Sequence, residues 1–440
     1  MLKTYFPNEA KNTILKRIAL DDVPVSENIL NNIESLFSER ISPAEAVSRI
    51  VKDIKQNQDN ALRSWTQKLD GVLVDDFLIN QEEIDSAINN LSPEIRNAIE
   101  LSANRVKAFH EAQPITSWMT QSLGGTLGQF VRPIQRVGIY IPAGTAPLPS
   151  SVIMSAVPAQ VAGVKEIAII APPDRKTGKI SPLILATAGL LSIHEIYTAG
   201  GAQAIAALAY GTESIKKVDK IFGPGNLFVS LAKRQLFGVV GIDSIAGPTE
   251  TLVIADEKAN PEWVAADLLA QAEHDALASA ILLTPSEELI KKVQNAVTKQ
   301  TQERNRSDII RSSMNNRSGA VLTQTLVEAV ELANQYAPEH LCLAVEKPWT
   351  LADKIYAAGG IFMGEHSFEV LGDYVAGPSH VMPTGGSARF SSPLNTLDFI
   401  HVVSLIALDK DTTQNIAPAA ALIADAEGLD AHANAARMRI

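Results

Sequence analysis

The stretch DLLAQAEHD, residues 267–275, joins an apolar helical stripe to side chains that can bind a cation. Gln271 and His274 are three residues apart, so on a helix they project from the same face. Amide oxygens and imidazole nitrogens can both act as ligands for a divalent metal ion. The spacing is not the H-E-x-x-H of zinc proteases. The stretch is therefore either a solvated helix end or half of a metal site whose other half lies elsewhere.

Six of the eight histidines come after residue 270, and several have polar neighbours. His340 follows Glu339 in YAPEHLCL, where a loop becomes an apolar strand. Asp373 lies near the start of a segment rich in Gly and Pro, residues 372–387. A lone histidine is more often hydrogen-bonded packing than a ligand. A loop of that length and polarity, however, is costly unless it builds a site.

The elements that must position these residues change character near Val137. The first 130 or so residues are charged and show the 3.6-residue spacing of helices. Short β-branched runs such as EIAIIAPP and TLVIAD then alternate with Ala/Leu-rich helical stretches. This alternation predicts parallel sheets covered on both faces. We expect an α/β protein with two doubly wound, Rossmann-like parallel-sheet domains and helical extensions at both termini.

Gly-rich turns fall where strands are expected to end: IPAGTAP, TAGGAQ, FGPGN and AGPTE. In an open α/β sheet, ligands bind beyond the carboxyl ends of the strands. Backbone N–H groups and a helix N-terminus at such a turn suit a phosphate. None of the turns reads G-x-G-x-x-G, so the usual dinucleotide fingerprint is absent. The turns either bind a nucleotide or only close strand-to-helix connections.

Composition excludes several classes of protein. The 440 residues are too many for one compact core, so two or more domains are expected. A net charge of −11 without a basic run disfavours a nucleic-acid partner. The single cysteine, Cys342, rules out an internal disulfide and a thiolate-rich metal site. Residues 137–164 are uncharged but broken by Pro and Gly, and the N-terminus lacks a secretory signal pattern. We expect a cytoplasmic protein with no membrane partner.

Five motifs together resemble the histidinol dehydrogenase family: QAEHD, YAPEHL, GDYVAGPSHVMPTGGSARFSS, FGPGN and the terminal LDAHANAARMRI. The resemblance runs from about Arg136 to Ile440, and the helical N-terminal region is compatible with it. It implies a zinc-dependent, NAD-linked enzyme that oxidises L-histidinol through L-histidinal to L-histidine, the last steps of histidine biosynthesis. It also implies an intertwined homodimer with shared active sites.

The resemblance assigns residues to each part of this chemistry. Glu339 and His340 match the catalytic acid–base pair. The implied zinc ligands are Gln271, His274, Asp373 and, from the other subunit, His432. The implied NAD-contacting residues are Tyr140, Gln203 and Asn226. The implied substrate-contacting residues are Thr249, Gln271, His274, His340, Asp373, Glu427 and His432. Thr249 departs from the family, which usually has Ser in a G-P-S-E motif, so the hydroxyl is kept and a methyl group is added.

The change in hydrophobic pattern along the chain and the family resemblance together predict four segments. We expect an N-terminal helical arm over residues 1–30 and a C-terminal helical tail, swapped in the dimer, over 391–440. The NAD-binding α/β domain is expected over 136–248. The other α/β domain, with the metal and catalytic residues, is expected to be discontinuous and to combine 31–135 with 249–390.

Three alternatives remain open at this stage. Some relatives oxidise other alcohols, including sulfonated diols. A zinc hydrolase with Glu339 as general base would explain the metal ligands but not the Gly-rich turns. A non-catalytic ligand-binding protein would not require Glu339 and His340 together.

Overall fold

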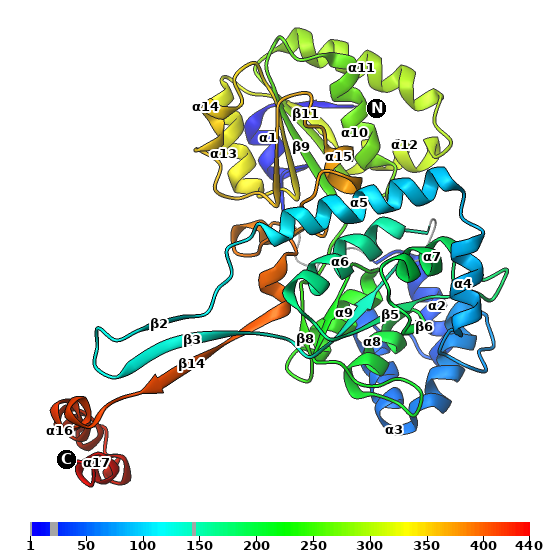
Figure 1. The fold of residues 1–440 in the computed structure, drawn as a ribbon. Coiled ribbons are helices and arrows are strands. Elements are labelled where there is room, and N and C mark those ends of the chain that lie inside the picture. The colour runs from blue at the N-terminus through cyan, green and yellow to red at the C-terminus, as the bar shows by residue number, and fades with distance from the viewer. Residues whose placement is uncertain (1, 18–24, 143–146) are drawn as a thin grey trace.

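Two α/β lobes and a projecting arm make up the chain (Figure 1). The structure is a computed structural model, and it describes residues 2–17, 25–142 and 147–440. Within these residues there are two parallel sheets of six and five strands and one antiparallel sheet of three. The expected fold class, two doubly wound parallel-sheet domains with extensions, is confirmed.

The first lobe is built on the six-stranded sheet. Its strands, in spatial order, are β1 (Thr4–Tyr5), β11 (Gly319–Leu322), β10 (Ser279–Thr284), β9 (Glu250–Ala255), β12 (His340–Ala344) and β13 (Gly360–Met363). Every residue of β9, β10 and β12 is buried, which is why these runs are apolar almost throughout. One core cluster joins the sheet to α10 (Pro261–Ala272), α11 (Glu287–Gln302) and α12 (Ser307–Asn316). A second cluster joins it to α1 (Pro7–Asn12), α13 (Leu326–Tyr336) and α14 (Trp349–Ala352).

The second lobe is built on the five-stranded sheet. Its strands, in spatial order, are β6 (Ile196–Thr198), β5 (Glu166–Ala171), β4 (Arg136–Tyr140), β7 (Lys220–Phe222) and β8 (Gly241–Ile242). The helices that follow these strands are α6 (Pro149–Ala162), α7 (Pro182–Leu190), α8 (Gly201–Tyr210) and α9 (Leu227–Leu236). Clusters of buried side chains fill both faces of the sheet.

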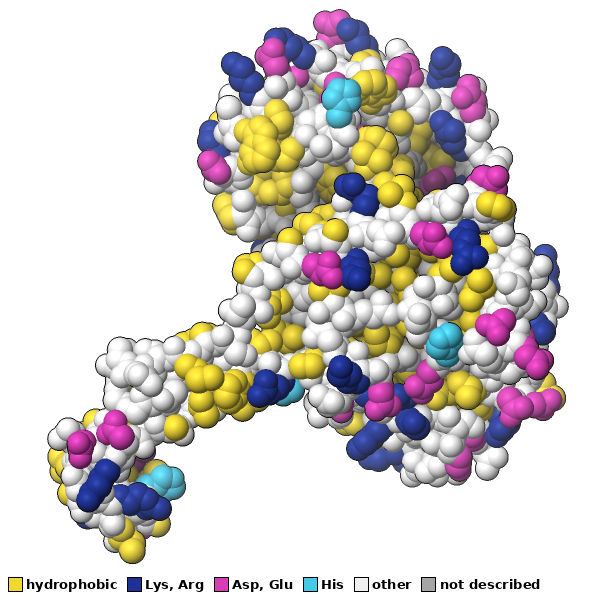
Figure 2. Space-filling model, viewed as in Figure 1, with side chains coloured by type: hydrophobic (Ala, Val, Ile, Leu, Met, Phe, Trp, Pro, Cys, Tyr) yellow, Lys and Arg dark blue, Asp and Glu magenta, His cyan; other side chains and the backbone are white. Residues whose placement is uncertain are grey.

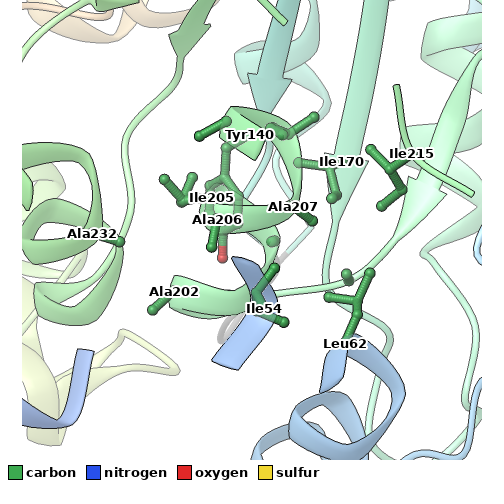
Figure 3. Close-up of a cluster of buried hydrophobic side chains, with 14 of the residues drawn as sticks. Ile54, Leu62, Tyr140, Ile170, Ala202, Ile205, Ala206, Ala207, Ile215 and Ala232 are labelled. Atoms are coloured by element: carbon green, nitrogen blue, oxygen red, sulfur yellow. The ribbon is translucent and has the colours of Figure 1, made fainter. Parts of the chain in front are cut away.

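The N-terminal helices cover the second sheet, so the expectation that residues 31–135 belong with 249–390 is wrong. These helices are α2 (Glu27–Phe37), α3 (Pro43–Asp70), α4 (Gln81–Asn89) and α5 (Pro93–Glu111). Helix α3 packs on α8 and α9, α4 on α7, and α5 on α6. Figure 3 shows Ile54 of α3 near Ala202 of α8, and Leu62 of α3 and Ile205 of α8 belong to the same cluster. Their apolar stripes fit any exposed apolar face, so spacing alone could not select the sheet.

The N-terminal arm is not wholly helical. Thr4 and Tyr5 pair with Ala320 and Val321, which places β1 at the edge of the first sheet. A strand of two residues has no measurable periodicity, so this strand cannot be predicted from hydrophobic spacing. The N-terminus is thereby joined to the lobe that carries Glu339 and His340.

The C-terminal segment begins as a strand and then becomes helical. Strand β14 (Ile400–Ala407) pairs antiparallel with β3 (Thr126–Pro133), which pairs with β2 (Trp118–Thr120). Helices α16 (Lys410–Ala426) and α17 (Asp430–Arg437) pack on each other at the end of this ribbon, far from both lobes (Figure 1). The expectation of a purely helical tail over 391–440 is therefore corrected. Among the described residues, no helix is long and apolar enough to cross a membrane.

Candidate active site

Glu339 and His340 lie at the start of β12, beside Thr249 and Glu250 at the start of the neighbouring β9. Gln271 is at the end of α10, and Asp373 is in α15 (Glu369–Tyr374). These residues gather at the amino ends of the strands, not at the carboxyl ends. The turn AGPTE follows β8 of the second sheet, as expected, and leads directly into the amino end of β9.

The carboxylate of Glu339 is buried and held by two donors. Thr249 Oγ1 donates to Glu339 Oε2 at 2.6 Å, and the backbone N–H of Glu250 donates to the same oxygen at 2.9 Å. Gln271 Nε2 in turn donates to Thr249 Oγ1 at 2.7 Å. The hydroxyl that replaces the serine of the G-P-S-E motif therefore makes two hydrogen bonds, and the added methyl does not prevent them.

His340 is surrounded by polar groups on both edges of its ring. Its Nδ1 lies 3.1 Å from the carbonyl oxygen of Glu250 and 3.1 Å from Gln271 Nε2. Its Nε2 lies 3.6 Å from Asp373 Oδ1, and within the described part of the chain this buried nitrogen has no hydrogen-bond partner. The ring is thus fixed by β9 and α10 while one nitrogen is left for another partner.

Burial and charge set the protonation of the pair. Burial raises the pKa of Glu339 to about 7, although the neighbouring His340 favours the ionised form. Burial alone would lower the pKa of His340, but the carboxylates of Glu369, Glu339 and Asp373 outweigh it and raise that pKa well above its ordinary value. Burial also raises the pKa of Glu369 to about 8. The site therefore holds more carboxyl groups than can all ionise together.

The side chains of the implied zinc ligands are of the types that bind Zn²⁺. A single chain brings only some of these ligands close to one another. Burial lowers the pKa of His274, with Asp373 close enough to oppose this, so its imidazole is held in the neutral form that binds metals. With the amide of Gln271, this gives nitrogen and oxygen donors suited to Zn²⁺. No three His, Cys, Asp or Glu side chains of the described ranges are arranged to hold a metal ion. His432 is exposed on α17, at the far end of the arm (Figure 1).

The implied NAD residues lie at or after the carboxyl ends of β4, β6 and β7. These are the strand ends at which the Gly-rich turns were expected. The hydroxyl of Tyr140 accepts from the backbone N–H of Gly201 at 3.2 Å, inside the core drawn in Figure 3. Gln203 Nε2 donates to Asp70 Oδ2 at 3.2 Å, and its buried Oε1 has no partner among the residues described. Asn226 caps α9 by accepting from Phe228 and Val229. Residues 143–146 of IPAGTAP lie outside the described residues.

Comparison with known proteins decides the family. A family model described as histidinol dehydrogenase matches residues 37–440. The histidinol dehydrogenase of Deinococcus radiodurans is 50% identical over 421 residues, which is 95% of each chain. The chain belongs to the histidinol dehydrogenase family. The relative from Moorella thermoacetica is 48% identical over 90% of this chain and 94% of its own. A crystal structure of histidinol dehydrogenase from Elizabethkingia anophelis superposes with a TM-score of 0.90 at 39% identity, covering 100% of this chain and 98% of that one.

Family membership closes two of the alternatives. Members are dehydrogenases, so the chain is an oxidoreductase, and both the zinc hydrolase and the non-catalytic binding protein are wrong. The histidinol dehydrogenase resemblance first noted from five motifs is confirmed over nearly the whole chain.

Several residues of the site were missed by sequence reasoning. Glu369 is buried 4.0 Å from His340 Nδ1, and Glu250 contacts Glu339 and His340 through its backbone. Arg17 reaches the site from the N-terminal arm and pairs with the side chain of Glu250. Glu250 could have been suspected as the neighbour of Thr249. Nothing local marks Arg17, because its contacts are with residues more than two hundred positions away.

Proposed function

We propose that this enzyme oxidises L-histidinol by way of L-histidinal to L-histidine, with NAD as hydride acceptor and zinc as resident metal. The observation that carries the proposal is the buried Glu339–His340 pair at the start of β12, with Thr249, Gln271 and Asp373 around it. Glu339 has a pKa of about 7, and His340 Nε2 has no hydrogen-bond partner among the described residues. Two such neighbouring groups are suited to two successive proton transfers.

His340 takes the hydroxyl proton as hydride leaves the carbinol carbon. Its Nε2 has no hydrogen-bond partner among the residues that the structure describes, and it lies 3.6 Å from Asp373 Oδ1. The charge of Asp373 is one reason that the pKa of His340 is raised. When Asp373 is engaged by a cation, that charge is offset, so the neutral imidazole that a general base requires is favoured.

Glu339 serves the second oxidation. It accepts a proton from the water that hydrates the aldehyde, and a further hydride transfer gives the acid. The two hydrogen bonds from Thr249 and Glu250 hold one carboxylate oxygen, which leaves the other for water.

Zinc and NAD are assigned to residues of this chain. Gln271, His274 and Asp373, with His432 of the partner subunit, would hold zinc, which orients the amine and imidazole of the substrate and stabilises charge at its oxygen. Tyr140, Gln203 and Asn226 would contact NAD, and Thr249, Glu427 and His432 would contact substrate. Gln203 Oε1 is buried and has no partner in the described part of the chain, which supports its assignment to NAD, because a buried polar atom needs a partner. We also expect the enzyme to work in the cytoplasm.

A homodimer with exchanged tails accounts for the arm. Figure 2 shows hydrophobic side chains gathered on the ribbon and on the helices at its end. Val402, Ile406, Leu422 and Ile423 are each more than half exposed. Isolated ribbons and helix pairs with such faces are stable only against a partner. A second copy of this chain would cover them and receive His432.

The test is NADH absorbance after mixing enzyme and NAD with histidinol, histidinal or a sulfonated diol in separate reactions. We expect two NADH per histidinol consumed and none from the diol. Production of NADH from the diol alone would identify the alternative family activity, and silence with all three would refute the proposal.

Removing zinc is the second arm of that test. Chelation should abolish turnover and Zn²⁺ should restore it. Without the metal that Gln271, His274 and Asp373 are proposed to hold, the substrate would not be oriented. Full activity in a metal-free sample, verified by atomic emission, would contradict the zinc assignment.

A further inference from the structure

Arg17 connects the N-terminal arm to the acid–base pair, and we propose that it is a positioning residue for Glu339 and His340. It touches neither of them. It acts through the side chain of Glu250 and through the two carbonyls of Tyr336 and Ala337. The inference rests on the proposed function, in which Glu339 and His340 exchange protons with substrate and water.

The guanidinium of Arg17 is spread over two elements that converge on the site. Nε donates to the carbonyl oxygen of Tyr336 at 2.7 Å, and Nη2 donates to that of Ala337 at 3.0 Å. Nη1 forms an ion pair with Glu250 at the start of β9. The guanidinium carbon lies 3.5 Å from the centre of the Tyr336 ring, and this contact restricts the orientation of the guanidinium group.

The two carbonyls lie directly before the catalytic residues. Ala337 has φ 50° and ψ 66°, a left-handed conformation that is unfavourable for a residue with a Cβ. It ends α13 and turns the chain into Pro338, Glu339 and His340. Donors from Arg17 on both carbonyls hold this turn, and the turn sets where β12 begins.

Glu250 relays the contact to both catalytic side chains. Its backbone N–H donates to Glu339 Oε2, and its carbonyl oxygen lies 3.1 Å from His340 Nδ1. Its own carboxylate is buried, with Oε1 paired to Arg17 and also accepting from the N–H of Gly385 at 3.3 Å. Oε2 has no partner within the described ranges. Loss of Arg17 would therefore leave the buried carboxylate of Glu250 without its cation, which favours displacement of Glu250.

If Arg17 only stabilised the fold, its loss would lower Tm without a specific loss of kcat. Arg136 provides a control for that possibility. Arg136 is also buried and also bridges two elements, through ion pairs with Glu166 and Glu195. These contacts lie at the amino ends of the second sheet, away from the turns at its carboxyl ends. Replacing Arg136 should lower stability as replacing Arg17 does, without displacing Glu339 or His340.

The experiment compares Arg17→Met, Arg17→Lys and Arg136→Met in the zinc-loaded enzyme. We expect Arg17→Met to lower kcat by about ten- to a hundredfold, the range for displaced catalytic groups, with KM for NAD and zinc content unchanged. Arg17→Lys should recover part of kcat, because an ammonium can pair with Glu250 but cannot also hold both carbonyls. Arg136→Met should lower Tm with kcat close to that of the wild type.

A double-mutant cycle identifies the path of the effect. In a Glu339→Gln background, adding Arg17→Met should lower kcat less than it does in the wild type, because only His340 is then left for Arg17 to position. Wild-type kcat in Arg17→Met, a kcat loss in Arg136→Met equal to that in Arg17→Met, or full additivity in the cycle would each overturn the inference. If Arg17→Met does not fold, Arg17→Lys decides by the same criteria. A wild type that produces no NADH from histidinol would instead refute the proposed function, and the role of Arg17 with it.

Discussion

Glu339 keeps a pKa of about 7 because burial opposes ionisation more strongly than Thr249, Glu250 and His340 favour it. A carboxyl group that titrates near neutrality can both accept and return a proton under physiological conditions. In the proposed mechanism, the hydration of the aldehyde uses this group, whereas removal of the first hydride depends on His340. The two half-reactions should therefore respond differently to the loss of the Glu339 carboxylate.

Glu339→Gln should lower turnover of supplied histidinal by about a hundredfold or more, the usual contribution of one general base, and affect the first oxidation of histidinol less. Steady-state NADH formation with each substrate measures the two losses. Glu346→Gln, which removes an exposed carboxylate paired with Lys258, is the matched control. Equal losses on both substrates would mean that Glu339 is only structural.

Asp70 provides a test of stability against pH at the proposed NAD site. Burial raises its pKa from 3.8 to about 6, despite the hydrogen bond from Gln203. The folded-state pKa lies above the unfolded one, so this carboxyl is favourable when protonated at low pH, and that advantage is lost as the pH rises through 6.

Asp70→Asn should therefore raise the free energy of unfolding, and with it Tm, more at pH 8 than at pH 5, with the two gains differing by about 1 kcal/mol. The asparagine oxygen can still accept from Gln203. Thermal melts of both proteins at the two pH values provide the measurement, with the exposed Asp76→Asn as control. A smaller gain at pH 8 than at pH 5 would show that Asp70 is stabilised as the anion.

At the scale of elements, the turn FGPGN is held by a buried ion pair. Lys233 of α9 donates to the carbonyl oxygen of Gly223 at 3.0 Å and pairs with Asp243. Asp243 Oδ2 accepts from the N–H of Gly223 at 2.8 Å, so both peptide groups of this glycine are fixed. Gly223 has φ 105°, and a Cβ there would lie 2.1 Å from the carbonyl oxygen of Tyr140. The turn that carries Asn226 is thus built against the end of β4.

Lys233→Met should raise KM for NAD by about tenfold while KM for histidinol changes little, because the turn proposed to contact the cofactor is loosened. Initial rates at varied NAD and varied histidinol separate the two constants. Arg136→Met breaks a buried ion pair of the same sheet at the opposite ends of its strands and should leave both constants unchanged. An equal rise in the two constants would place the turn outside the cofactor site.

The sequence predicted elements better than it predicted their partners. The buried strands and Gly-rich turns were found because apolar runs such as EIAIIA and the glycines are local signals. The sheet that α3 and α4 cover could not be found, since an amphipathic helix does not specify what its apolar face meets. Strand β1 and the contacts of Arg17 depend on residues more than two hundred positions away. Glu369 was missed because its contact with His340 arises only when α15 packs beside β12 and has no local sequence pattern, whereas the family resemblance supplied Gln271, His274 and Asp373.

At the scale of the whole molecule, the arm separates His432 and Glu427 from every other residue of the proposed site. Both are exposed, and the helices that carry them lie beyond the ribbon of β2, β3 and β14 (Figures 1 and 2). A terminal helix of this kind would ordinarily fray. The exposed apolar side chains of β14 and α16 give it a reason to dock on a second copy. Tail exchange would then place His432 and Glu427 beside Gln271, His274 and Asp373 of the partner.

Mixed dimers test that exchange. His340→Ala and His432→Ala homodimers should both be nearly inactive, since each lacks a residue of every site. In a mixed dimer with exchanged tails, both lesions fall in one site and the other site is intact. Random pairing of equal amounts makes half the dimers mixed, with half of their sites intact, so about one quarter of wild-type activity should return. If each tail docked on its own chain, every site would carry one lesion and mixing would recover nothing. Co-expression of the two variants with different affinity tags, followed by double purification, isolates the mixed dimer from that population. The purified mixed dimer should have about half of wild-type activity, because one of its two sites is intact. An inactive mixed dimer would refute the exchanged arrangement.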